Sequence, residues 1–148
     1  MRKRSNARSA ESKQEMTSRI QSLLQDIGRL MANAIVGDPS GAFLYAEVEP
    51  GMTSWGLFVD RGDYVEYLSD DEGICEALVD LWRLSEQGKK WSGLSYAIVQ
   101  GSFDAQFYYS ESWVDDEIYA DRRERILAAR YADKPIRYPP PPSDAMEV

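Results

Sequence analysis

Near the start of the chain, hydrophobic side chains recur at three- and four-residue steps: Ile20, Leu23, Leu24, Ile27, Leu30, Met31, Ala34 and Ile35. This spacing predicts one apolar stripe on a helix of about four to five turns, which Gly37-Asp38-Pro39 ends. Residues 1–14 are almost without apolar side chains and carry five basic ones. We therefore expect residues 1–14 to form a disordered basic arm; a solvated tail is the commoner outcome for such an arm, and contact with nucleic acid is the alternative.

Short runs rich in aromatic and branched residues follow, and they predict strands over 43–49, 54–60, 64–68, 94–99 and 102–109. The second and third runs are joined by Asp60-Arg61-Gly62-Asp63, and the last two by Gln100-Gly101, which are typical of tight hairpin turns. The final run alternates apolar and polar residues most regularly. Strands paired by tight turns indicate an antiparallel sheet.

Two further helices are expected. Ser69-Asp70-Asp71-Glu72 has the pattern of a capping box, and it precedes an apolar stripe formed by Ile74, Ala77, Leu78, Leu81 and Leu84. A charged helix should follow over roughly 115–130, and the proline run after Tyr138 should be extended. The sequence thus predicts an α+β domain over 15–138, in the order α-βββ-α-ββ-α, with about five antiparallel strands, helices packed on the sheet and a Pro-rich tail over 139–148.

Charge narrows the choice of partner. Between Val36 and Gln87 there are twelve acidic side chains and two basic ones, a larger imbalance than the net −8 of all 148 residues. A sequence pI near 4.6 disfavours nucleic acid and anionic membranes and favours a cationic protein. There is no membrane-length apolar run and no signal-peptide core, so a cytoplasmic location is expected.

The chain contains no histidine and one cysteine, Cys75. Ser-His and Cys-His nucleophile pairs are therefore excluded, a zinc site is disfavoured, and no phosphate-binding or dinucleotide-binding motif is present. Paired carboxylates for glycoside hydrolysis, and a hard cation held by 60–63 or 70–72, are the chemistries that remain. We expect a binding protein with no catalytic residue, metal or cofactor; a carboxylate-dependent hydrolase is the least favoured alternative.

The segment from Trp91 to Tyr109 resembles the hairpin of the YezG-type immunity proteins. In that family a tryptophan precedes a strand, a glycine turn follows, and the return strand ends in an aromatic pair before an acidic stretch. The resemblance extends over about residues 18–138, forward through Asp115-Asp116-Glu117, Arg122-Arg123-Glu124 and Lys134-Pro135-Ile136. The basic arm, the Pro-rich tail and the first three strands depart from the family pattern.

The resemblance implies a bacterial antitoxin that binds and neutralises the nuclease domain of a secreted polymorphic toxin. A nuclease must grip a polyanion, so a basic toxin domain would complement an acidic inhibitor. A regulatory or assembly subunit of a bacterial complex, with a more apolar interface, is the alternative. The sequence does not fix the toxin or the oligomeric state.

Acidic residues beside exposed aromatic ones are the expected contacts, because charge guides approach and aromatic anchors hold a complex. The first candidate cluster is Tyr108, Trp113, Asp115, Asp116 and Glu117. The second is Asp60, Asp63, Glu66, Asp70 and Asp71. For the first cluster, the alternative is that Trp113 staples the last helix to the sheet while the acids favour its N-terminus. For the second, it is a solvated edge that discourages aggregation.

Overall fold

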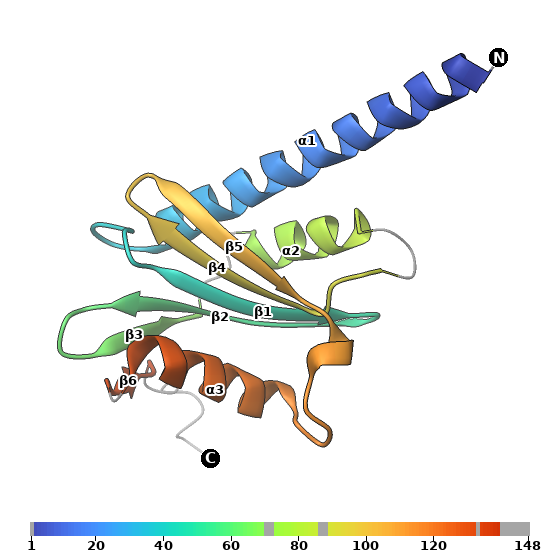
Figure 1. Cartoon of the computed structure of the whole chain (residues 1–148). Coiled ribbons are helices and arrows are strands. Elements are labelled where there is room, and N and C mark those ends of the chain that lie inside the picture. The colour runs from blue at the N-terminus through green and yellow to red at the C-terminus, as the bar shows by residue number, and fades with distance from the viewer. Residues whose placement is uncertain (1, 70–72, 86–88, 133, 140–148) are drawn as a thin grey trace.

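The computed structural model describes residues 2–69, 73–85, 89–132 and 134–139, with the backbone alone over 2–11. In chain order it contains α1 (Arg2–Ala34), β1 (Phe43–Glu49), β2 (Met52–Asp60), β3 (Val65–Leu68), α2 (Ile74–Arg83), β4 (Gly93–Val99), β5 (Ser102–Tyr108), the short 3-10 helix η1 (Ser110–Ser112), α3 (Tyr119–Tyr131) and β6 (Ile136–Arg137) (Figure 1). The expected α+β class is confirmed.

The sheet has six strands in the order β5-β4-β1-β2-β3-β6. The expectation of about five antiparallel strands is therefore corrected, because β6 pairs with β3 in parallel, with Val65 opposite Ile136. The N–H of Val65 also donates to the carbonyl of Pro135 at 2.8 Å. A two-residue strand is too short to produce a periodic pattern, so sequence alone could not reveal it.

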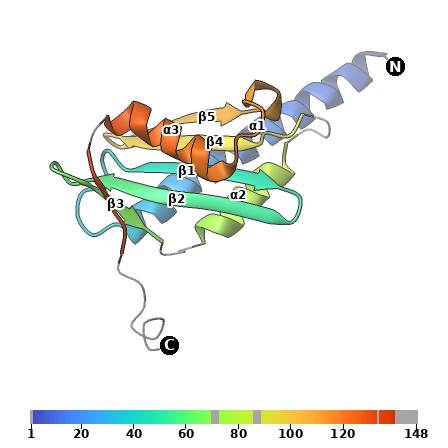
Figure 2. The same ribbon diagram turned by 90° about the horizontal axis from the view of Figure 1, so that it is seen from below.

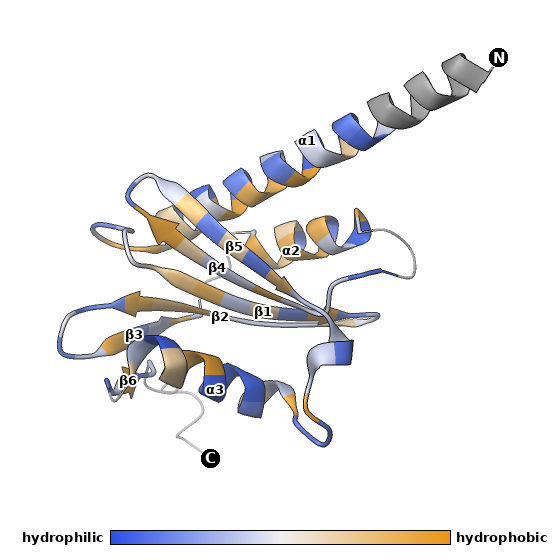
Figure 3. Cartoon of the chain, in the orientation of Figure 1, coloured by the Kyte–Doolittle hydropathy of each residue, from blue (hydrophilic) through white to orange (hydrophobic). Residues whose placement is uncertain are grey.

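Helices cover both faces of the sheet (Figures 1 and 2). Leu44, Leu57 and Leu94 lie in the core shared with α1 and α2, whereas Phe43 and Phe58 lie in the core beneath α3. Central strands therefore carry apolar residues on both faces; Figure 3 shows apolar residues of the sheet in orange. This two-sided burial explains why β1 and β2 do not alternate regularly.

Helix α1 is longer than the apolar stripe requires. Its buried residues Leu24, Ile27 and Met31 lie in its second half, and its first turns extend past the rest of the molecule (Figure 1). Residues 2–14, expected as a disordered arm, are part of this helix. Arg, Lys, Ala and Gln are good helix formers, so this segment can continue the helix by its intrinsic propensity.

The starts of α2 and α3 differ from the expected ones. Helix α2 begins at Ile74 after Gly73, whose φ is +95°; of the expected capping box, residues 70–72 lie outside the described part of the chain. Helix α3 begins at Tyr119 rather than near Asp115, because Asp116 has a φ of +67°, which a right-handed helix does not accommodate. Residues 113–118 therefore form a loop before α3.

Candidate protein-binding surface

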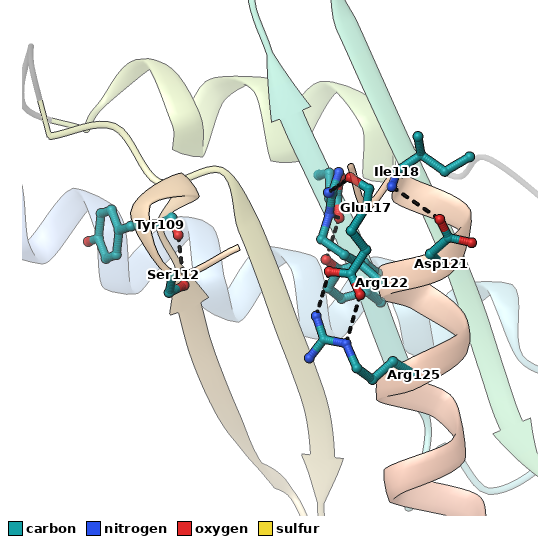
Figure 4. Close-up of polar contacts among 9 residues, drawn as sticks. Tyr109, Ser112, Glu117, Ile118, Asp121, Arg122 and Arg125 are labelled. Atoms are coloured by element: carbon teal, nitrogen blue, oxygen red, sulfur yellow. Dashed lines mark hydrogen bonds and ion pairs between the residues drawn. The ribbon is translucent and has the colours of Figure 1, made fainter. Parts of the chain in front are cut away.

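The connection from β5 to α3 runs across one end of the sheet and contains most of the first predicted cluster. It leaves β5 through η1, where the Tyr109 carbonyl accepts hydrogen bonds from the Ser112 N–H at 3.0 Å and from the Ser112 hydroxyl at 2.8 Å (Figure 4). At its far end, the N–H of Ile118 donates to the Asp121 carboxylate at 3.3 Å. Both ends of the connection are thus tied by local hydrogen bonds.

A buried ion pair joins this connection to the centre of the sheet. Arg122 of α3 donates through Nε and Nη2 to the two oxygens of Glu47 in β1, each at 2.7 Å, and both side chains are about one-tenth exposed. The Tyr45 hydroxyl donates to the same carboxylate at 2.5 Å. The remaining Nη1 of Arg122 donates to the Glu117 carbonyl. One guanidinium therefore holds β1, α3 and the loop before α3 together.

The surroundings of the buried ion pair shift the pKa values of Arg122 and Tyr45. Hydrogen bonds to Glu47 raise the pKa of the Arg122 guanidinium. Burial, reinforced by the hydrogen bond to Glu47, raises the pKa of Tyr45. Arg122 consequently stays charged, and Tyr45 stays a neutral donor, throughout the physiological pH range.

Trp113 and Glu117 contribute to the scaffold of this end. The Arg122 guanidinium carbon lies 3.8 Å from the centroid of the Trp113 ring, a stacked cation–π geometry. The Glu117 carboxylate accepts from Arg125 at 2.9 and 3.0 Å, and its side chain is 14% exposed. Trp113 therefore packs on α3 in the manner of a staple, and the charge of Glu117 is already paired.

The other members of the first cluster divide between interior and surface. Tyr108 lies on the same face of the sheet as Tyr45, with the ring centroids 6.3 Å apart, and its hydroxyl accepts from Ser95 at 2.9 Å. Asp115 and Asp116 are exposed in the loop before α3. Of the five residues, these two are the most available to a partner.

A pocket of about 470 Å³ opens beside the loop. Met52 and Ile118 line it and are 57% and 63% exposed, and Val114, in the adjacent loop, is 63% exposed. Exposed Glu49 lines the same pocket, and exposed Glu111, Asp115 and Asp116 lie in the connection that carries Val114 and Ile118. We call this set the acidic rim surface: Glu49, Met52, Glu111, Val114, Asp115, Asp116 and Ile118.

Five residues of the acidic rim surface were not expected from the sequence: Glu49, Met52, Glu111, Val114 and Ile118. An exposed apolar side chain in a loop has no periodic neighbours that mark it. Glu49 and Met52 flank the β1–β2 turn, and they line the same pocket as Ser110 of η1, which is far from them in the sequence. The mixture of acidic and apolar residues over 111–118 is the one local signal that could have indicated the surface.

The second predicted cluster lies elsewhere. The Asp60 carboxylate accepts from Lys134 at 2.8 and 2.9 Å; this hydrogen bond, chiefly, lowers the pKa of Asp60. Glu66 pairs with Arg61 at 3.3 Å, Asp63 is exposed, and Asp70 and Asp71 fall outside the described residues.

The two predicted clusters do not form one surface. Lys134, which contacts Asp60, follows the end of α3, whereas Glu117 precedes its start. A helix of 13 residues spans about 20 Å. Figure 1 likewise shows the β2–β3 turn and η1 at opposite ends of the sheet. A partner that contacts one patch of modest size can therefore bind one of the two clusters but not both.

Over the residues that the structure describes, no three Cys, Asp or Glu side chains gather as a possible metal site. None of the described helices combines the length and the apolar character needed to cross a membrane. The chain matches no protein-family model and no curated protein.

Proposed function

We propose that this protein is an immunity protein that binds a cognate nuclease-type toxin through the acidic rim surface and neutralises it by covering its active site. The observation that carries the proposal is the placement of exposed Met52, Val114 and Ile118 among acidic side chains. Apolar anchors ringed by charge are what a tight protein interface needs, because the anchors supply affinity and the charges supply orientation and speed.

The scaffold beneath this surface supports the same function. The Glu47–Arg122 pair and the stacked Trp113 fix the loop before binding, so little conformational entropy is lost when a partner docks. The exposed carboxylates would face the basic side chains with which a nuclease grips its substrate. The resemblance to YezG-type immunity proteins points to the same kind of partner. On this proposal the protein acts in the cytoplasm, without catalysis or a cofactor.

The test uses the toxin domain encoded beside this gene. Wild-type protein should form a stoichiometric complex with that domain and abolish its nuclease activity. The charge-matched triple variants Glu111→Gln/Asp115→Asn/Asp116→Asn and Asp60→Asn/Asp63→Asn/Glu66→Gln then locate the contact. We expect the first to weaken inhibition at least tenfold and the second to leave it nearly unchanged.

The outcomes separate the parts of the proposal. Loss of inhibition in the second triple variant alone would move the interface to the β2–β3 turn and overturn the assignment to the acidic rim surface. A wild-type protein that neither binds nor inhibits any adjacent toxin domain would overturn the immunity function itself.

A regulatory or assembly subunit is the second candidate, and the exposure of Met52, Val114 and Ile118 is the observation that favours it. An assembly interface would depend mainly on these apolar side chains. The affinity of an assembly interface would change little with ionic strength. The affinity of a toxin complex guided by carboxylates would fall as the ionic strength rises.

A further inference from the structure

The two edge strands of the sheet differ in length. One edge is β6, which has two residues, and the other is β5, which has seven. No described strand pairs with the outer side of β5. A long open edge offers unpaired N–H and C=O groups to another strand.

The hydrogen-bond register shows which groups of β5 face outward. The Ile98 N–H donates to the Ala42 carbonyl at 3.0 Å, and the Ile98 carbonyl accepts from Gly41 at 2.9 Å, so Ile98 is directed toward β1. Its neighbour across the hairpin is Phe103. In an antiparallel ladder the hydrogen-bonded pairs alternate, and the N–H and C=O of Phe103, Ala105 and Phe107 therefore point away from β4.

We propose that β5 pairs antiparallel with β5 of a second copy of this chain, about a two-fold axis at Ala105. This register places Ala105 opposite Ala105 and Phe103 opposite Phe107 of the second copy. These are the three residues whose backbone groups face outward, so all of those groups find partners. A two-fold contact of this kind is self-complementary and closes as a dimer.

The side chains fit this register on both faces. On the α1/α2 side, half-buried Phe103 would lie opposite Phe107 of the second copy, an aromatic cross-strand pair. On the other side, exposed Asp104 would lie opposite exposed Gln106, so no like charges meet. An axis at Asp104 would place that carboxylate opposite itself and Phe107 opposite Gly101 of the turn. An axis at Gln106 would place Phe103 opposite Tyr109, beyond the end of β5. The Ala105 axis is therefore the one that pairs the three outward-facing residues with one another.

Sedimentation velocity of the full chain and of Ala105→Pro tests the pairing. The Ala105 N–H faces away from β4, so proline at this edge position preserves the hairpin while removing a donor from the dimer. We expect wild-type protein to dimerise and the variant to weaken dimerisation at least tenfold, with an unchanged circular dichroism spectrum. A wild-type protein that stays monomeric at every accessible concentration, or a folded variant that dimerises as wild type does, would overturn the proposal.

Charge exchange tests the register independently of proline. Gln106→Asp places a second carboxylate opposite Asp104 across the axis, and Asp104→Lys/Gln106→Lys places lysine opposite lysine. Each variant alone should be monomeric, whereas an equimolar mixture should form heterodimers. If both variants form homodimers as wild type does, or if their mixture stays monomeric, the register is wrong. Binding of a toxin strand to β5 without self-association would likewise count against a second copy as the occupant.

Discussion

Glu47 and Arg122 are 75 positions apart in the sequence, and their contact determines what the end of the sheet can present. In the sequence, Glu47 is one of twelve acids in a negative stretch, and Arg122 belongs to a charged run before the midpoint of α3. Charge counting assigns both to the surface. Their burial could not be predicted, because a long-range ion pair leaves no local pattern.

Arg122→Met tests how much the Glu47–Arg122 pair contributes to the free energy of unfolding. The variant leaves the Glu47 carboxylate buried with the Tyr45 hydroxyl as its donor, and removal of one partner from a buried pair costs about 3–5 kcal/mol. Urea unfolding measures the loss. Arg125→Met is the matched control: its pair with Glu117 is half exposed on the arginine side, so about 0–1 kcal/mol is expected. Equal losses in the two variants would contradict the central role of Arg122.

Tyr96 makes stability depend on pH in the alkaline range. Burial raises its pKa to about 12, whereas an unfolded tyrosine ionises near pH ~10. Above that pH the unfolded chain releases a proton that folded Tyr96 retains, so the free energy of unfolding falls as the pH rises. The stabilising contribution is complete below the unfolded pKa and is lost as the pH rises through the folded one.

Tyr96→Phe should remove this part of the pH dependence. At neutral pH the variant loses the 2.6 Å hydrogen bond to the Leu24 carbonyl, at a cost of about 1 kcal/mol. Urea unfolding between about pH 9 and 12 should show the difference from wild type narrowing as the pH rises. Tyr109→Phe, at an exposed side chain, should keep the wild-type slope; a constant difference for Tyr96→Phe would be the contrary result.

At the scale of elements, strand bounds were the most predictable feature. Residues 43–49 form β1 as expected, and β4 and β5 each differ from expectation by one residue. The start of α3 was not predictable, since it depends on the left-handed backbone at Asp116, a non-glycine residue. The site was predicted only in part for a related reason. The two clusters were chosen by composition, whereas the distance between them along α3 follows from how the elements pack.

Gly28 sets how closely α1 approaches the sheet. A Cβ at this position would lie 2.5 Å from the Tyr96 hydroxyl, which is buried and bonded to α1 itself. Gly28→Ala should therefore lower the free energy of unfolding, because overpacking costs about 1–3 kcal/mol against a gain in helix propensity of about 1 kcal/mol.

The Tyr96→Phe background supplies the control for Gly28→Ala. Without the hydroxyl, the added methyl group has room, and the helix-propensity gain should dominate. Urea unfolding of the four proteins gives the coupling energy. A Gly28→Ala effect that is the same in both backgrounds would show that α1 is free to shift away from β4.

At the scale of the whole molecule, ion pairs within the fold neutralise part of the acidic charge of the described residues. Glu47, Asp60, Glu66 and Glu117 are paired with basic side chains, so the net charge overstates the carboxylates available to a partner. The exposed ones at the acidic rim surface adjoin exposed apolar groups. Composition predicted an anionic protein, and only the fold distinguishes the structural acids from the accessible ones.

The difference between exposed carboxylates and exposed apolar side chains predicts which substitutions change the association rate with a basic partner and which change the dissociation rate. Exposed carboxylates act before contact, so Glu111→Gln/Asp115→Asn/Asp116→Asn should slow association about tenfold at low salt, and the difference should vanish as salt screens the charges. Met52→Ala/Ile118→Ala removes apolar contacts made only after docking and should speed dissociation roughly tenfold or more. Surface plasmon resonance with the toxin domain at several ionic strengths measures both rates. If the charge variant alters dissociation alone, the carboxylates make close contacts within the complex and do not steer the encounter.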